Sequence, residues 1–194
     1  MNDDFDPIAF VTGVSRGIGR SIAEKLLASN IPVIGTAHKS PFSAELENES
    51  HFEGVRVDLS TEKSFRESLK KIFQGESPPN VIVNNAGISE EASFALGDEE
   101  WEDNWERTIQ TNLKTPALIC KWALNRWTKT PSIPGIIINI ASRAAYRGDT
   151  ADFASYAASK GGLAAFTKSI ARSYGKRRIT AYTIAPGFVD TDMA

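Results

Sequence analysis

Three residues between positions 142 and 160 carry side chains that could move a proton to or from an oxygen atom. Tyr156 and Lys160 are four residues apart, so they share one face of an expected helix. A phenol, with a pKa of about 10, is a poor acid at neutral pH, but an ammonium group one turn away stabilises the phenolate. Ser142 could hold a carbonyl or alcohol oxygen beside the phenol. The trio therefore predicts proton exchange with a substrate oxygen while a hydride moves elsewhere.

An isolated Tyr-x-x-x-Lys pair is common in ordinary helices, so the chemical interpretation depends on the elements around it. Residues 135–140 are apolar and rich in β-branched side chains, which predicts a buried strand. Residues 153–174 contain no proline and many good helix formers, which predicts a long helix. Ser142 then follows the carboxyl end of a strand, where open α/β sheets place their binding sites.

Strands and helices alternate along the whole chain. We expect a long helical stretch over residues 98–127, with Pro116 as a candidate bend, and a helix over 60–74 that begins with an incomplete capping box at Ser60. This alternation is typical of βαβ units with right-handed crossovers. The sequence thus predicts one α/β domain over residues 1–194, a doubly wound, Rossmann-like parallel sheet of strand order 3-2-1-4-5-6. The other expected strands are residues 8–11, 32–37, 55–57, 81–83 and 179–185, and the other expected helices are residues 20–29 and, weakly, part of 39–51.

Length and composition exclude several classes of protein. The chain has 194 residues and a net charge of −2, so it can bury a sizeable core and has no basic bias toward nucleic acid. No apolar run approaches the roughly 20 residues of a membrane helix, and the first ten residues do not resemble a signal peptide. Cys120 is the one cysteine, which fits a reducing cytoplasm, and two histidines leave little material for a metal site. We expect a cytoplasmic protein without metal, membrane or nucleic-acid partners.

Three glycines lie between the first expected strand and the first expected helix. Gly13, Gly17 and Gly19 form the pattern Gly-x-x-x-Gly-x-Gly. Glycine permits a tight turn and a close approach of the backbone to a pyrophosphate, which the N-terminus of a helix attracts. A glycine pattern alone is a weak signal, but here it has the strand–turn–helix context that a dinucleotide site requires.

With these motifs in their order, the whole chain resembles the short-chain dehydrogenase/reductase family. Residues 12–19 are similar to the family's cofactor motif, residues 84–87 (Asn-Asn-Ala-Gly) to its fourth-strand motif, and Pro186-Gly187 with Thr191 to its motif after the sixth strand. Among family members, the glycine turn and residues 33–36 most resemble 3-oxoacyl-acyl-carrier-protein reductases. The residues similar to the family's catalytic tetrad are Asn112, Ser142, Tyr156 and Lys160.

The resemblance implies a role for each of these residues. Tyr156 would be the general acid in reduction and the base in oxidation, Lys160 would assist it and hold the nicotinamide ribose, and Ser142 would position the substrate oxygen. Asn112 would hold a water molecule in a proton relay through Lys160. The implied cofactor-binding residues are Gly13, Ser15, Arg16, Gly17, Ile18, Gly19, His38, Asp58, Leu59, Asn85, Ala86, Gly87, Tyr156, Lys160, Pro186, Gly187, Val189 and Thr191.

The end of the second expected strand favours NADP(H) over NAD(H). A carboxylate at this place would bind a ribose 2′-hydroxyl and repel a 2′-phosphate. Residues 36–39 read Thr-Ala-His-Lys and contain no acid, while Arg16 lies in the glycine turn. Arg16, His38 and Lys39 are therefore candidate donors to a 2′-phosphate. In the alternative interpretation His38 and Lys39 are only solvated loop residues.

Two departures from the family pattern affect the expectations. Tyr182 stands where the family commonly has an asparagine in its sixth strand, which puts one structural hydrogen bond in doubt. Family members usually continue beyond the point that corresponds to Ala194, with a mobile substrate lid and a seventh strand. We therefore expect the chain to be C-terminally truncated and to lack that strand.

The leading functional expectation is NADPH-dependent reduction of a ketone, such as a 3-oxoacyl thioester, to a secondary alcohol. A sugar, polyol or other secondary-alcohol dehydrogenase stays open, as does an inactive cofactor-binding regulatory or scaffold protein. Basic residues at positions 172 and 176–178 offer a docking surface for an acyl carrier protein, although they also simply complement a helix dipole. The family resemblance and the small residues within 156–165 predict a homodimer or homotetramer.

Overall fold

A single parallel sheet organises the computed structural model, which describes residues 6–130 and 134–189. The strand order is β3-β2-β1-β4-β5-β6, and every neighbouring pair is parallel, as the sequence predicts. Because parallel strands are joined by crossovers, all six carboxyl ends meet at one edge of the sheet. The strands are β1 Ala9–Val11, β2 Val33–Ala37, β3 Phe52–Arg56, β4 Val81–Asn84, β5 Gly135–Ile140 and β6 Ile179–Ile184.

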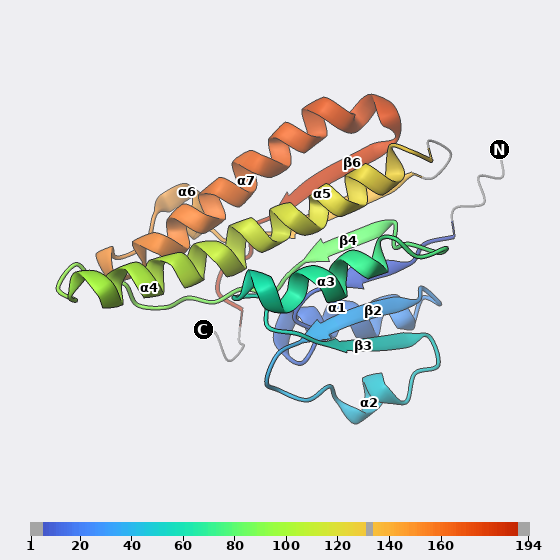
Figure 1. Ribbon diagram of the computed structural model, residues 1–194, viewed down its shortest axis with the longest axis horizontal. Helices are drawn as coiled ribbons and strands as arrows, with labels where there is room; N and C mark the ends of the chain where they lie inside the picture. Colours follow the sequence, from blue (N-terminus) through green and yellow to red (C-terminus); the bar gives the residue numbers. More distant parts are fainter. Residues whose placement is uncertain (1–5, 131–133, 190–194) are drawn as a thin grey trace.

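Helices cover both faces of this sheet. Figure 1 shows α3, α5 and α7 on one face, with α1 behind strands β1 and β2 on the other. The α-helices are α1 Gly17–Leu27, α2 Ala44–Glu47, α3 Glu62–Ile72, α4 Asp98–Ile109, α5 Thr115–Trp127, α6 Ala144–Arg147 and α7 Ala154–Tyr174. Shorter turns are η1 Gln110–Lys114, η2 Ala151–Phe153 and η3 Gly175–Arg177. None of the helices within residues 6–130 and 134–189 has the length and apolar character to cross a membrane.

Alternate residues of the strands fill two separate hydrophobic clusters, because successive side chains point to opposite faces of a sheet. Phe10, Ile82 and Ile137 pack with α3, α5 and α7, whereas Val11 and Val83 pack on the side of α1. Burial on both faces explains why these strands read as continuous apolar runs in the sequence. The packed sheet gives the turns at its carboxyl edge a rigid base.

The long helical stretch is interrupted before Pro116, the expected bend. A π-helical turn, η1, joins α4 to α5, and Asn112 is its central residue. Pro116 lies in the first turn of α5, where its missing N–H is tolerated. Such π-helical turns often occur at functional sites, because they move one side chain out of the regular helical row.

Two local expectations were wrong. β3 begins at Phe52, before the expected residue 55, because its partly exposed residues weaken the apolar signal of an edge strand. Ser60 does not cap α3: the N-cap is Thr61, without a side-chain hydrogen bond. The hydroxyl of Ser60 instead donates to Asp58 Oδ1 at 2.7 Å, a local side-chain bond that competes with capping.

Candidate active site

A pocket of about 780 Å³ opens along the carboxyl edge of the sheet, within the size range of small-molecule and cofactor sites. Gly19 and Asn112 are outside its lining, and Thr191 lies outside the described residues. The other residues predicted from the sequence all line it. They are Gly13, Ser15, Arg16, Gly17, Ile18, His38, Asp58, Leu59, Asn85, Ala86, Gly87, Ser142, Tyr156, Lys160, Pro186, Gly187 and Val189.

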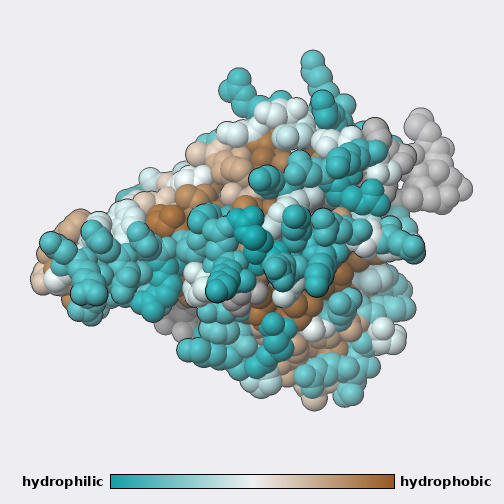
Figure 2. All heavy atoms as spheres, in the orientation of Figure 1, coloured by the Kyte–Doolittle hydropathy of each residue, from teal (hydrophilic) through white to brown (hydrophobic). Residues whose placement is uncertain are grey.

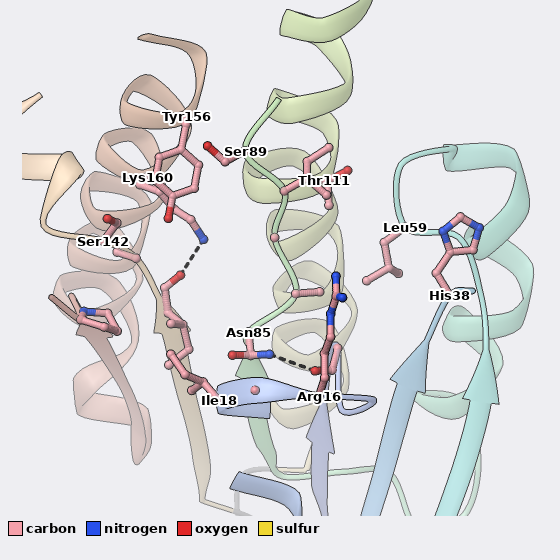
Figure 3. Close-up of a pocket in the computed structure, with 18 of the residues that line it drawn as sticks. Arg16, Ile18, His38, Leu59, Asn85, Ser89, Thr111, Ser142, Tyr156 and Lys160 are labelled. Atoms are coloured by element: carbon pink, nitrogen blue, oxygen red, sulfur yellow. Dashed lines mark hydrogen bonds between the residues drawn. The ribbon is translucent and has the colours of Figure 1, made fainter. Parts of the chain in front are cut away.

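Tyr156, Lys160 and Ser142 lie together on one side of this pocket (Figure 3). The first turns of α7 carry Tyr156 and Lys160, and the Lys160 Nζ atom lies 5.7 Å from the centroid of the Tyr156 ring. Ser142 follows β5, and its Oγ accepts a hydrogen bond from the N–H of Ala144 at 3.1 Å. Accepting this bond fixes the hydroxyl oxygen and leaves the O–H free to donate toward the pocket.

Lys160 is deeply buried for a charged side chain, with only 4% of its surface exposed. Its ammonium group donates to the carbonyl oxygen of Ile140 at 2.9 Å. Burial lowers the pKa of Lys160 from its ordinary 10.5 to about 8, because a charged amine is poorly solvated there. An ammonium has three N–H donors, so further donors are available to oxygen atoms that enter the pocket.

The glycine turn after β1 requires glycine at specific positions. Gly13 and Gly17 have φ angles of +74° and +56°, which residues with a side chain rarely adopt. A Cβ atom added to Gly19 would lie 2.1 Å from the carbonyl oxygen of Gly13 and 2.3 Å from Nδ2 of Asn85. Gly19 therefore does not line the pocket. Its missing side chain allows the first turn of α1 to pack closely against the glycine turn.

The turn after β4 clamps the glycine turn in place. The amide of Asn85 donates to the carbonyl oxygens of Thr12 at 3.0 Å and Gly13 at 3.1 Å. In return, Thr12 Oγ1 accepts the backbone N–H groups of Asn85 and Ala86, each at 3.0 Å. The first residues of α1, Gly17 and Ile18, line the pocket, so the N-terminus of this helix is available to a pyrophosphate there.

Asn112 braces the site from the side of the π-helical turn. It is fully buried, its Oδ1 accepts the N–H of Ile88 at 2.9 Å, and its Nδ2 donates to Ile88 O at 2.8 Å and Ser159 Oγ at 3.0 Å. Both amide hydrogens are therefore used within the protein. The water molecule of the expected proton relay would therefore have to contact Oδ1 or the backbone of Asn112. This contact stays a prediction.

The opposite end of the pocket carries His38, Asp58 and Leu59, at the ends of β2 and β3. Figure 3 shows His38 and Leu59 across the pocket from Tyr156 and Ser142. The imidazole of His38 lies 3.8 Å from the carboxylate of Asp58. Partial burial acts to raise the pKa of Asp58, but hydrogen bonds from Ser60 and the nearby imidazole outweigh it and lower that pKa.

A buried polar bridge lies beneath the site and joins β4, β5 and α7. Asn84 donates to Asn139 at 2.7 Å, and Asn139 donates to Thr167 at 2.8 Å. Tyr182, the residue that departs from the family pattern, is 55% exposed on β6 and belongs to no part of this bridge. The bridge ties the two strands that precede Asn85 and Ser142 to the helix that carries Tyr156.

Several pocket residues were missed by the sequence analysis. They include Ser89, Thr111, Arg143, Arg147 and Phe188. The Arg143 guanidinium carbon lies 3.7 Å from the centroid of the Phe188 ring, and the Thr111 hydroxyl is buried without a hydrogen-bond partner in the described chain. A signal was available for the arginines: Arg143 directly follows Ser142, and Arg147 is four residues further on.

Comparison with known proteins extends over the whole pocket. The sequence profile described as short chain dehydrogenase matches residues 7–194. The chain is 38% identical over 192 residues to the 3-oxoacyl-[acyl-carrier-protein] reductase FabG of Pseudomonas aeruginosa, and 38% identical over 189 residues to that of Escherichia coli. Each alignment covers 96% of this chain and 75% of the relative.

Solved structures give the same result. A 4-hydroxyisoleucine dehydrogenase complexed with NADH and succinate superposes with a TM-score of 0.86 at 26% identity, covering 96% of this chain and 78% of that one. A NAD(P)-dependent gluconate 5-dehydrogenase from Beutenbergia cavernae with bound NADP has a TM-score of 0.83 at 25% identity, covering 96% and 74%. Sequence and fold thus agree over the residues that build the pocket, and the chain belongs to the short-chain dehydrogenase family as an oxidoreductase that uses NAD(P).

Proposed function

We propose that the protein reduces a ketone to a secondary alcohol with NADPH, and that the ketone is a 3-oxoacyl thioester. The observation that carries this proposal is the meeting of Tyr156, Lys160 and Ser142 on one side of a pocket that also contains the glycine turn. Support for the thioester comes from the relatives at 36–38% identity, which are named 3-oxoacyl-[acyl-carrier-protein] reductases.

The chain's own groups would carry the proton chemistry, while NADPH, when bound, supplies the hydride. Ser142 donates its free O–H to the carbonyl oxygen and so fixes the substrate's orientation. Tyr156 gives its phenolic proton to the same oxygen as negative charge develops there. The ammonium of Lys160 stabilises the phenolate that remains. In the oxidative direction the phenolate takes the proton back.

Lys160 also fits a second role, as a donor to the ribose hydroxyls of the cofactor. Its ammonium retains donors beyond the bond to Ile140 O, and they lie within the pocket wall. Gly87 is needed for this arrangement, because a Cβ atom there would approach Lys160 Nζ and Asn112 Oδ1 to 3.2 Å. Asn112 would act as a positioning residue through Ile88 and Ser159.

The proposed preference for NADPH depends on the far end of the pocket. Arg16 and Lys39 line it, and β2 ends without a carboxylate. Arg16 offers planar paired donors that suit phosphate oxygens. The side chain of His38 is 52% exposed at the same end of the pocket, where a ring N–H could donate to a 2′-phosphate.

Two partners belong to the proposal. Arg172, Lys176 and Arg177 are exposed at the end of α7 and support docking of an acidic acyl carrier protein; complementing the helix dipole is the alternative. We also propose that the protein self-associates.

Oxidation of NADPH in the presence of acetoacetyl-coenzyme A tests the function, with NADH, a polyol series and simple ketones as comparisons. We expect turnover of the thioester and a rate with NADPH at least about tenfold above that with NADH, as one charge-assisted contact would give. Turnover of polyols alone would establish the dehydrogenase alternative. Cofactor binding without turnover of any compound would establish a regulatory protein.

A further inference from the structure

The catalytic end of the pocket holds two arginines that the proposed chemistry does not use. Arg143 and Arg147 are the N-cap and the last residue of α6, and both line the pocket. Arg143 directly follows Ser142 in the chain, and Arg147, four residues later, lies on the same face of α6. α6 lies against α7 beside the catalytic lysine, since a Cβ atom on Gly161 would be 3.6 Å from the carbonyl oxygen of Ala145. Both arginines therefore belong to the same pocket as Ser142, Tyr156 and Lys160.

Arg147 makes no ion pair within the part of the chain that the structure describes. Arg107, the third arginine at this end, is engaged with Glu90 at 2.7 Å and with Asn104 at 2.7 Å. Within residues 6–130 and 134–189, no carboxylate lies within 4.0 Å of the Arg147 guanidinium. Asp149 lines the same rim, but its Oδ1 accepts the N–H of Thr150 at 2.9 Å.

Arg143 is held in place by an aromatic ring. Its guanidinium carbon lies 3.7 Å from the centroid of the Phe188 ring, and its backbone N–H donates to the carbonyl oxygen of Pro186 at 3.2 Å. Stacking on a ring occupies the flat face of a guanidinium and leaves its N–H edge free to bind oxygen atoms. One fixed and one unpaired guanidinium thus border the substrate end of the pocket.

We propose that Arg147, together with Arg143, binds an anionic group of the substrate, so that the substrate is an oxo compound bearing a carboxylate or a phosphate. The inference rests on the proposed function only in that the reacting group is a carbonyl. Guanidinium groups bind carboxylate and phosphate in the same forked geometry. The anion is thus either a carboxylate near the ketone or a phosphate on the arm of a thioester, and matched substrates distinguish the two.

Two substrate pairs, each with an anionic and a neutral member, provide the kinetic test. Acetoacetate is compared with ethyl acetoacetate, and acetoacetyl-coenzyme A with acetoacetyl-N-acetylcysteamine. We expect Arg147→Gln to lower kcat/KM for the charged member of at least one pair by about tenfold, the effect of one charge-assisted contact. The neutral member should change less than about twofold, because it makes no such contact. The pair that responds identifies the source of the anion.

Matched variants sharpen the result. Arg147→Lys should recover part of the loss, because the charge remains. Asp149→Asn should act in the opposite direction and raise kcat/KM for the same charged compound, since it removes a repelling carboxylate from the rim. Lys168→Gln, which removes an exposed charge of α7 that does not line the pocket, should leave both pairs unchanged. Equal losses for charged and neutral members in Arg147→Gln would overturn the proposal.

A binding experiment separates this inference from the proposed reaction. The oxidised cofactor cannot reduce a ketone, so acetoacetate and acetoacetyl-coenzyme A can be titrated calorimetrically into protein saturated with NADP⁺ or NAD⁺, whichever binds. At least one of them should bind about tenfold more weakly to Arg147→Gln than to the unmodified protein. If neither does, the anion site is disproved; if binding behaves as expected while no ketone is ever turned over, the proposed reaction fails and the anion site stands.

Discussion

The candidate active site contains a lysine that is shielded from solvent. Lys160 reaches the carbonyl oxygen of Ile140 at the end of β5, and only 4% of its surface is exposed. The same burial that fixes its position near Tyr156 also makes its charge costly, which is why its pKa falls to about 8. The protonated form of Lys160 therefore destabilises the folded protein when no ligand is bound.

This lysine should make the unliganded protein more stable as the pH rises. Because the pKa of Lys160 is lowered from 10.5 to about 8, the folded chain binds fewer protons than the unfolded chain between these values. Above pH 10.5 the amine is neutral in both the folded and the unfolded chain, so its burial carries no charge penalty. As the pH falls from 10.5 through about 8, this relative stability of the folded chain is lost. Relative to Lys160→Met, the free energy of unfolding should rise by about 2–3 kcal/mol between pH 7 and 10, at roughly 1.36 kcal/mol per pKa unit. Urea unfolding of both proteins, without cofactor, measures it.

The comparison with Lys160→Met removes the titration of all other groups from the result. Lys168→Met removes an exposed lysine from the same helix and is the matched control for the loss of such a side chain. If the difference in unfolding free energy between the unmodified protein and Lys160→Met did not change with pH, Lys160 would be solvated in the folded protein.

Spacing alone predicted that Tyr156 and Lys160 share one face of a helix, because side chains four residues apart lie together. Their chemical role could be predicted only with the motifs around them. The proposed anion site could not be predicted, because only the folded chain shows that Arg107 pairs with Glu90 whereas Arg147 has no ion-pair partner among the described residues.

At the scale of elements, the turn after β1 and the π-helical turn carry the site. Gly13 and Gly17 adopt positive φ angles, and Gly19 leaves no space for a side chain. The sequence revealed this turn because glycine is required by its geometry. It did not reveal the π-helical turn at Asn112, since one extra residue in a helical row leaves the apolar pattern nearly unchanged.

Gly19→Ala should weaken cofactor binding by at least about tenfold, equivalent to about 1.4 kcal/mol. The new Cβ atom would lie 2.1 Å from the carbonyl oxygen of Gly13, so the backbone of the turn must move. Gly175→Ala is the matched control, because nothing lies within 4 Å of a Cβ atom at that position. Fluorescence titration with NADPH measures both variants, and equal affinities would show that the turn adapts.

Asn112→Ala should lower the free energy of unfolding by about 2–4 kcal/mol, because it removes a fully buried amide and leaves the partly buried N–H and C=O groups of Ile88 without partners. Asn104→Ala is a control of the same chemistry on an exposed part of α4, where Asn104 donates to Glu91 O at 2.8 Å, and it should cost less than about 1 kcal/mol. Urea unfolding compares the two variants. Similar losses would mean that Asn112 does not brace the loop.

The start of α3 shows a limit of sequence patterns. A serine followed by a helix predicts a cap, but Ser60 bonds to Asp58, which is two residues before it and lies in the pocket. Whether a hydroxyl caps a helix or orients a carboxylate is decided by small differences between two local hydrogen bonds.

For the whole molecule, alternating strands and helices were enough to predict the strand order, because right-handed crossovers leave few arrangements of a parallel sheet. The edge strand β6 leaves apolar side chains uncovered: Tyr182 is 55% and Ile184 is 48% exposed. Figure 2 shows one face of the molecule, where polar side chains predominate and apolar patches are interspersed. Tyr182 and Ile184 are two residues apart on one face of an edge strand, which makes them candidates for an interface between copies of the chain.

We predict that the protein self-associates at micromolar concentration. Light scattering should give a mass that is a multiple of 21.2 kDa. Tyr182→Glu should shift the equilibrium toward the monomer if β6 contributes to the interface, whereas Tyr146→Glu, an exposed tyrosine on α6, serves as the control. A monomeric mass for the unmodified protein at these concentrations would contradict the prediction.

We propose that Tyr156 is the proton donor of a dinucleotide-dependent reductase, and the decisive variant is Tyr156→Phe. Phenylalanine keeps the ring beside Lys160 and removes only the hydroxyl, so the dissociation constant of NADPH should change less than about twofold, well under the tenfold that 1.4 kcal/mol would give. Reduction of acetoacetyl-coenzyme A should fall by about 10²–10⁴-fold, the usual contribution of general acid catalysis. Tyr174→Phe, at the end of the same helix, should remain active. If Tyr156→Phe kept more than about a tenth of the activity, far above that range, Tyr156 would not be the acid.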